Sequence, residues 1–147
     1  MRAHAYGGTL HPMHRTRQIR TARPLRVLIV DAHEVSRAAC SALLRTEGLA
    51  VTDVAPGDHV IALAQAQKPE VVLIDAGSGA RLRDTAQRLR ALACAPLVLL
   101  TSSAERDRLD PLIRELPFLA KADICAEAIL RTVAAGCDEQ PVAAASE

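Results

Sequence analysis

Four short apolar runs recur between residues 26 and 121, and each is followed by a residue whose side chain can do chemistry. The runs are Val27–Val30, Val71–Ile74, Leu97–Leu100 and Phe118–Ala120, and the residues that follow them are Asp31, Asp75, Thr101 and Lys121. These runs do not alternate apolar with polar positions, which is typical of strands that are buried on both faces of a parallel sheet.

Helical patterns fill the segments between these runs, so strands and helices alternate along the chain. We expect strands at 26–31, 49–54, 70–75, 97–101 and 118–121, and helices at about 34–47, 57–67, 80–93, 103–115 and 124–135. Gly48 and Pro69 end the first two helices, and Pro111 suits only a first turn or a kink in the fourth. The pattern predicts an α/β fold: a doubly wound (βα)₅ parallel sheet with right-handed crossovers.

Two of the expected helices have a distinct apolar face. The face is formed by Val60, Ile61, Leu63 and Ala64 in the helix at 57–67, and by Leu82, Ala86, Leu89 and Leu92 in the helix at 80–93. Aromatic residues are nearly absent, since Tyr6 and Phe118 are the only two. The core must therefore be built from leucine, valine, isoleucine and alanine.

The 147 residues suit a single domain between two tails. We expect a flexible basic tail at 1–24, a domain at 25–136 and a flexible tail at 137–147. The first 26 residues hold six arginines and no acidic residue, so the other 12 basic residues face all 17 acidic ones. Met13 is an alternative start of the chain, and a basic arm that touches an acidic partner or nucleic acid is an alternative role for the first tail.

Several classes of protein are disfavoured by composition. The domain has no basic stripe of the kind that nucleic-acid binding requires, and no apolar stretch approaches the length of a membrane span. The N-terminal segment lacks the apolar centre of a secretory signal. The four cysteines are scattered without metal-site spacing, which favours reduced thiols in a cytoplasmic protein.

The residues at the strand ends predict a site for a phosphoryl group. In open α/β sheets ligands bind at the carboxyl edge of the strands, where Asp31, Asp75, Thr101 and Lys121 would meet. A carboxylate that can attack phosphorus, a hydroxyl donor and an ammonium group suit the uptake and release of a phosphoryl group.

Each of these residues also has a simpler interpretation. Asp75 can cap a turn, Asp31 can cap the helix that follows it, and Thr101 can begin the next helix, although Ser103 is better placed for that cap. Lys121 can form a solvent-exposed pair with nearby Asp123, and Phe118 can be a core residue.

Over residues 25–136 the chain resembles the receiver domain of bacterial two-component response regulators. The segments that carry the resemblance are RVLIVDAHEVSR, PEVVLIDAG, PLVLLTSS and FLAKAD, and the last is most similar to regulators of the NarL/FixJ type. The resemblance implies the flavodoxin/CheY-like fold with strand order 2-1-3-4-5.

The resemblance also implies roles for individual residues. Asp75 would be the phospho-accepting aspartate, and the Thr101 hydroxyl would hydrogen-bond the phosphoryl group. Lys121 would pair with a phosphoryl oxygen. Phe118 would be the aromatic switch that rotates when the hydroxyl is recruited.

The implied cofactor is Mg²⁺, held by Asp31, Asp75 and Gly77. The family usually has two adjacent acids after the first strand, but Ala32 stands at the second position. One carboxylate fewer weakens the hold on a strongly hydrated ion.

Further departures lie around the site. His33 or Glu34 are candidates to compensate for Ala32, although His33 is more simply interpreted as a loop residue. The loop after Asp75 reads Gly77-Ser78-Gly79-Ala80 and lacks the usual Pro-Gly pair. The short spacing from Thr101 to Lys121 implies an abbreviated fourth helix.

Three functions fit this sequence. The first is a single-domain receiver that takes a phosphoryl group on Asp75 from a histidine kinase or phosphotransfer protein. It would act on a downstream protein or as a homodimer. We expect no enzymatic activity beyond self-phosphorylation and autodephosphorylation. The second is a degenerate receiver that binds partners without phosphorylation. The third is a flavodoxin-like small-molecule binder, which the acidic DAHE loop at 31–34 and the lack of aromatics disfavour. A fragment of a longer DNA-binding regulator is also open.

Overall fold

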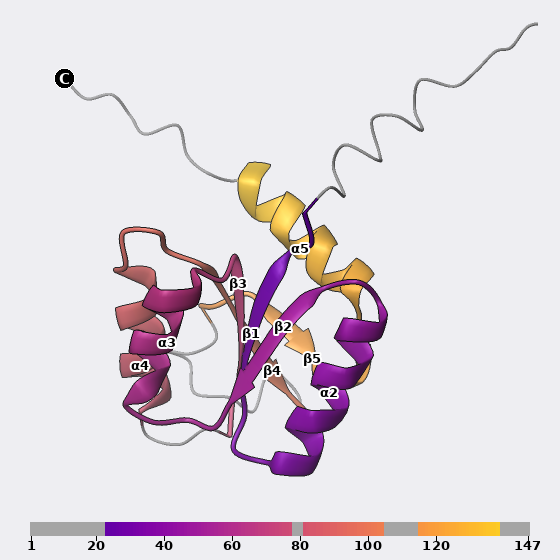
Figure 1. Cartoon of the computed structure of the whole chain (residues 1–147), viewed down its shortest axis with the longest axis horizontal. Helices are drawn as coiled ribbons and strands as arrows, with labels where there is room; N and C mark the ends of the chain where they lie inside the picture. The colour runs from indigo at the N-terminus through magenta and orange to yellow at the C-terminus, as the bar shows by residue number, and fades with distance from the viewer. Residues whose placement is uncertain (1–22, 78–80, 105–114, 139–147) are drawn as a thin grey trace, which may run out of the picture.

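The computed structural model describes residues 23–77, 81–104 and 115–138. Its strands form one parallel sheet in the order β2-β1-β3-β4-β5 (Figure 1). The strands are β1 (Arg26–Val30), β2 (Ala50–Val54), β3 (Val71–Asp75), β4 (Leu97–Ser102) and β5 (Phe118–Ala120). The helices are α2 (Glu34–Thr46), α3 (His59–Gln67), α4 (Leu82–Arg90) and α5 (Ala126–Asp138), with a 3₁₀ turn, η2, at Lys121–Asp123. The predicted doubly wound sheet and its strand order are confirmed.

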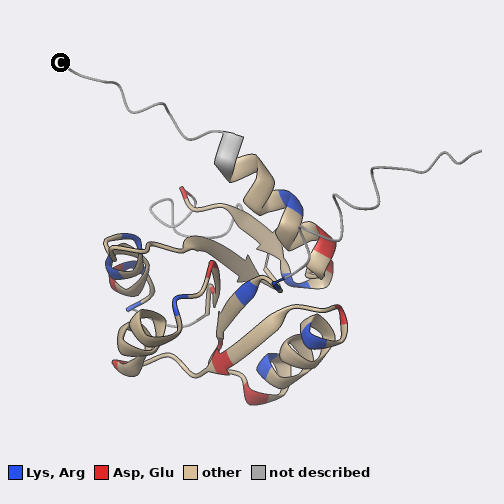
Figure 2. Ribbon diagram, turned by 45° about the horizontal axis from the view of Figure 1, so that its top comes forward, with Lys and Arg blue, Asp and Glu red and all other residues tan. Residues whose placement is uncertain are grey.

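Helices cover both faces of the sheet. Helices α3 and α4 lie on one face, and α2 and α5 lie on the other (Figure 1). Charged residues lie mainly on the helices and at the ends of the strands (Figure 2). This distribution leaves the interiors of the central strands β1 and β3 apolar, as the two-sided burial of a parallel sheet requires.

Two hydrophobic clusters fill the space between the sheet and its helices. Successive residues of each strand point to opposite faces, so Leu28 and Val30 pack under α3 and α4, whereas Val27 and Ile29 pack under α2 and α5. The helices contribute Val60, Ala64, Leu82, Ala86 and Leu89 to the first cluster and Leu44, Ala126 and Ile129 to the second. The apolar faces predicted for α3 and α4 are therefore in the core.

Some predicted boundaries were wrong by one to three residues. Leu92 lies beyond the end of α4, although it still packs against the first cluster. Strand β5 ends at Ala120, because the chain turns into η2 at Lys121. Gly48 has a φ of 95°, which lets the chain leave α2 through the left-handed region.

Several sequence-based expectations fall outside the described residues. These are the helix at about 103–115 with Pro111, most of the tail at 1–24, the tail from 139 onward and the loop at 78–80. Among the described helices, none combines the length and the apolar character that crossing a membrane requires.

Candidate functional site

The four residues singled out at the strand ends meet at the carboxyl edge of the sheet. Asp75 is the last residue of the central strand β3, and its register partner on β4 is Thr101. Asp31 directly follows β1, and Lys121 directly follows β5. Asp31, Asp75 and Thr101 are each less than 7% exposed. The site is thus a buried polar cluster at the end of an apolar sheet.

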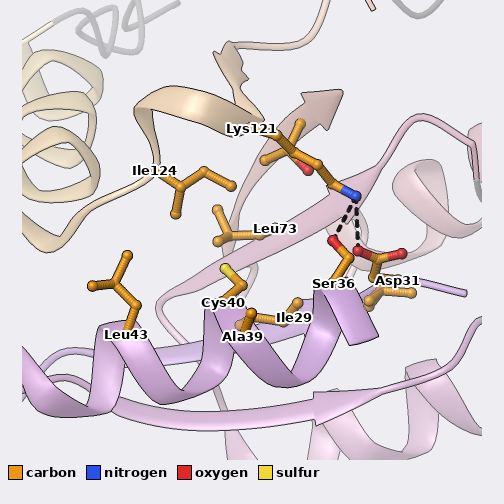
Figure 3. A pocket seen from close by; sticks show the side chains of 11 residues that line it. Ile29, Asp31, Ser36, Ala39, Cys40, Leu43, Leu73, Lys121 and Ile124 are labelled. Carbon is orange, nitrogen blue, oxygen red and sulfur yellow. Dashed lines mark hydrogen bonds and ion pairs between the residues drawn. The ribbon is translucent and has the colours of Figure 1, made fainter. Parts of the chain in front are cut away.

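Lys121 is the centre of this cluster. Its Nζ lies 3.0 Å from Asp31 Oδ2 and 3.0 Å from Asp75 Oδ1, and it donates a third hydrogen bond, 2.9 Å long, to Ser36 Oγ. Figure 3 shows the ammonium pointing toward Ser36 and Asp31, which lie at the start of α2 and the end of β1. An ammonium group has three N–H donors, and all three have partners here. The simpler interpretation of Lys121, a solvent-exposed pair with Asp123, does not describe these contacts, whereas its predicted place in the site does.

Backbone N–H groups hold the other oxygen of each carboxylate. The N–H of His33 donates to Asp31 Oδ1 at 2.9 Å, and the N–H of Gly77 donates to Asp75 Oδ2 at 3.0 Å. A Cβ added at Gly77 would lie 2.9 Å from that same Oδ2, which is closer than such contacts allow. The residue two positions after Asp75 must therefore be small for the carboxylate to keep this orientation.

The electrostatics favour the charged forms of Asp31 and Lys121. Burial is the largest single effect on the pKa of Asp31 and raises it, but the His33 N–H and Lys121 together hold this pKa below its ordinary value. Burial likewise lowers the pKa of Lys121, but its hydrogen bonds and Coulomb attraction to Asp31 and Asp75 bring that pKa above its ordinary value. Two carboxylates and one ammonium leave the cluster with a net negative charge.

Two carboxylates are compatible with Mg²⁺, which proteins usually bind through one or two carboxylates, waters and a phosphate oxygen. Asp31 and Asp75 provide them. Ala32 contributes only a methyl group where the resemblance implies a further carboxylate. The residues present therefore fit the ion, with one anionic ligand fewer than the resemblance implies.

His33 is the site residue that the sequence argument set aside. One ligand atom from each of Asp31, His33 and Asp75 lies within 4.8 Å of the other two. His33 Nδ1 is 3.4 Å from Asp31 Oδ1, although the side chain is 69% exposed. The sequence signal for His33 was its position two residues after Asp31. A residue at this position lies in the loop after the first strand, and this loop is at the same edge of the sheet as the site.

Thr101 and Phe118 lie on the neighbouring strands. Thr101 is buried, and Ser102, the last residue of β4, accepts the N–H of Ala104 at 2.9 Å, so Ser102 closes the turn that follows the strand. The helix for which Ser103 was the predicted cap is outside the described ranges. Phe118 pairs with Leu100 and packs, partly buried, against the first cluster. Its role as a switch stays a prediction.

An apolar cavity of about 270 Å³ opens beside the cluster, between α2 and the segment around Ile124. Asp31, Ser36 and Lys121 form its polar end, and Cys40 points into it (Figure 3). Burial, together with the charge of Asp31, raises the pKa of Cys40. The thiol is therefore protonated at neutral pH and is a poor nucleophile.

Several solved structures with this architecture are response regulators or their receiver domains. The chain is similar to a CheY-like response regulator receiver domain from Methylobacillus flagellatus, with a TM-score of 0.63 and 22% identity over 76% of this chain and 99% of that one. It is also similar to the signal receiver domain of a modulated diguanylate cyclase from Desulfovibrio desulfuricans G20, with a TM-score of 0.61 and 23% identity over 77% and 93% of the two chains.

A third similar structure is an atypical orphan response regulator described as having a phosphorylation-independent regulatory mechanism, with a TM-score of 0.54 and 14% identity over 76% and 93% of the two chains. No protein-family model and no curated protein matches this sequence. At these identities the comparisons establish the fold, which is the CheY-like receiver fold.

Proposed function

We propose that this chain contains a response regulator receiver domain of a bacterial two-component system, and that it accepts a phosphoryl group on Asp75. The observation that carries the proposal is the placement of Lys121 Nζ 3.0 Å from an oxygen of each of two buried carboxylates. A structural ion pair needs one acid. A second acid, with Thr101 beside it in register, makes the cluster suited to a group that brings its own negative charge.

In the proposed reaction, a carboxylate oxygen of Asp75 attacks the phosphorus of the donor. A bond forms between this oxygen and phosphorus, while the bond from phosphorus to the donor's leaving group breaks and its electron pair departs with that group. Lys121 is positioned to exchange a carboxylate partner for a phosphoryl oxygen. A bound divalent cation would neutralise part of the added charge.

The proposed donor is a histidine kinase or a phosphotransfer protein, and the proposed output is a contact with a downstream protein or with a second copy of the chain. The exchange at Lys121 and a hydrogen bond from Thr101 would alter the surface around β4 and β5, where Phe118 lies. This is a two-state switch that is biased by a local change of charge.

A degenerate receiver is the second candidate, and Ala32 is the observation that favours it. In this case Lys121 and the backbone N–H groups of His33 and Gly77 satisfy both carboxylates, no phosphoryl group is taken up, and partner binding is constitutive. The orphan regulator with a phosphorylation-independent mechanism is a precedent for this behaviour within the same fold.

The test is the intact mass of the protein after incubation with acetyl phosphate and Mg²⁺, beside an Asp75→Asn control. We expect one added phosphoryl group on the wild type and none on the control. The absence of an adduct on the wild type, under conditions that label a competent receiver, would favour the degenerate module. Ala32→Asp would then show whether the missing carboxylate alone explains the result.

A further inference from the structure

His33 gives this site a ligand that oxygen-only magnesium sites lack. Ala32 removes one carboxylate, and the residue after it places an imidazole nitrogen among the remaining carboxylate oxygens. Within the described residues, Asp31, His33 and Asp75 are the group of three potential ligands whose atoms lie within 4.8 Å of one another.

The backbone directs His33 toward the site. Its N–H is bonded to Asp31 Oδ1, and its carbonyl accepts the N–H of Arg37 at 2.8 Å in the first turn of α2. Arg37 in turn donates to the carbonyl of Asp31 at 2.8 Å and to Asp53 Oδ1 at 3.2 Å. The main chain around His33 is therefore held at both ends, whereas its side chain is largely exposed.

The distances are within reach of a metal site. An ion with bonds of about 2.1 Å holds two opposite ligands about 4.2 Å apart and adjacent ones closer. The three atoms, now within 4.8 Å of one another, would have to approach by roughly half an ångström or more to bind one ion. Lys121 holds the two carboxylates, whereas the His33 side chain is 69% exposed.

The charge of the cluster supports a cation. Lys121 occupies Asp31 Oδ2 and Asp75 Oδ1, and the other oxygen of each carboxylate accepts a backbone N–H. Each carboxylate oxygen can accept more than one partner. The net negative charge that remains after Lys121 is counted makes a second cation favourable.

We propose that His33 supplies the ligand that Ala32 cannot, so that Asp31, His33 and Asp75 bind a divalent transition-metal ion such as Mn²⁺ or Zn²⁺ in preference to Mg²⁺. Imidazole is a good ligand for first-row transition metals, whereas Mg²⁺ selects oxygen. The inference rests on the proposed function for the metal's role, which is to neutralise charge during phosphoryl uptake.

Mn²⁺ is the most useful probe, because it binds thiols weakly and is paramagnetic. Free Mn²⁺ is titrated by its electron paramagnetic resonance signal against the full chain, with Mg²⁺ as competitor. Spin-echo measurements of the bound ion then report whether a ¹⁴N nucleus is coordinated. The variants are His33→Ala and His33→Gln, with His59→Ala as a matched control, because His59 is also exposed but lies at the start of α3.

We expect both His33 variants to weaken Mn²⁺ binding at least about 10-fold and to lose the ¹⁴N signal, whereas His59→Ala changes neither. We also expect the preference for Mn²⁺ over Mg²⁺ to fall by the same factor. Unchanged Mn²⁺ affinity in folded His33 variants, or a ¹⁴N signal that persists in them, would overturn the proposal. Far-UV circular dichroism checks that the variants are folded.

The phosphorylation assay separates this inference from the proposed function. Mn²⁺ binding that depends on His33, without any phosphoryl adduct on Asp75, would support the metal site and overturn the receiver function. An adduct that forms equally with Mg²⁺ in the wild type and in His33→Ala, together with His33-independent Mn²⁺ binding, would support the receiver and overturn the metal site.

Discussion

Lys121→Met removes the ammonium group that two buried carboxylates share, and it keeps a side chain of similar length. The variant loses two hydrogen bonds of 3.0 Å to carboxylates, each worth about 1.5–3 kcal/mol, and a third to Ser36 Oγ. Asp31 and Asp75 each keep one backbone N–H, and water can enter because the Lys121 side chain is 21% exposed. We therefore expect a loss of about 3 kcal/mol in the free energy of unfolding at pH 7, at the lower end of the range for a broken buried pair.

The loss should depend on pH with a definite sign. The pKa of Asp31 is lowered in the folded protein, so its contribution to stability is present above its unfolded pKa, near 3.8, and disappears as pH falls through the lower folded value. Without Lys121, burial of Asp31 opposes its charged form, and protonation relieves that cost. The two proteins should therefore approach each other in stability as the pH falls from 5 toward about 3.

Urea denaturation followed by far-UV circular dichroism measures this difference, because the chain has no tryptophan for fluorescence. Lys68→Met is the matched control, since Lys68 is the other lysine of the chain, is exposed and ends α3. It should change stability by less than about 0.5 kcal/mol. Equal stability of Lys121→Met and wild type at pH 7, or a difference that persists undiminished at pH 3, would refute the reasoning.

Substitutions of Gly77 and Glu47, each with a comparison variant, test the surroundings of the site by the same denaturation assay. Gly77→Ala should lower the free energy of unfolding by about 1–2 kcal/mol, because the added Cβ would displace Asp75 Oδ2 from the backbone N–H. Gly136→Ala in α5 should raise it by about 0.5 kcal/mol, since the added Cβ would meet no atom closer than 3.9 Å. Glu47→Ala should lower the free energy of unfolding by about 1 kcal/mol, because Glu47 Oε1, at the end of α2, accepts the N–H of Ala126 at 2.6 Å and so caps α5. Glu47→Gln keeps an acceptor and should lower it less. An equal loss in both variants would argue against the cap.

The parallel sheet could be predicted from the sequence because the relevant signals are local, whereas its strand order was implied by the resemblance to receiver domains. Uninterrupted apolar runs such as 71–74 and 97–100 require burial on both faces, and short helical segments between them allow only parallel strands. The convergence of Asp31, Asp75 and Thr101 followed from the same argument, because the carboxyl ends of parallel strands share one edge.

The contacts within the site could not be predicted in this way. Ser36 and Lys121 are 85 residues apart in the sequence, and their hydrogen bond depends on how α2 packs against the end of β5. The hydrogen bond from the Ala126 N–H to Glu47 likewise depends on tertiary packing, in this case of the end of α2 against the start of α5. The contact of His33 with Asp31 could not be predicted because periodicity says nothing about loop residues, and the backbone of this one is held by hydrogen bonds to Asp31 and Arg37.

The measurement that tests the central claim most directly is the identification of the phosphorylated residue. Asp31 and Asp75 are both buried and both contact Lys121, so a mass increase alone does not distinguish them. Reduction with borohydride converts an aspartyl phosphate to homoserine, and peptide mapping after labelling with acetyl phosphate then locates it. We predict homoserine at position 75 and aspartate retained at position 31. Homoserine at position 31, or at neither position, would contradict the assignment of Asp75 as the phosphoryl acceptor.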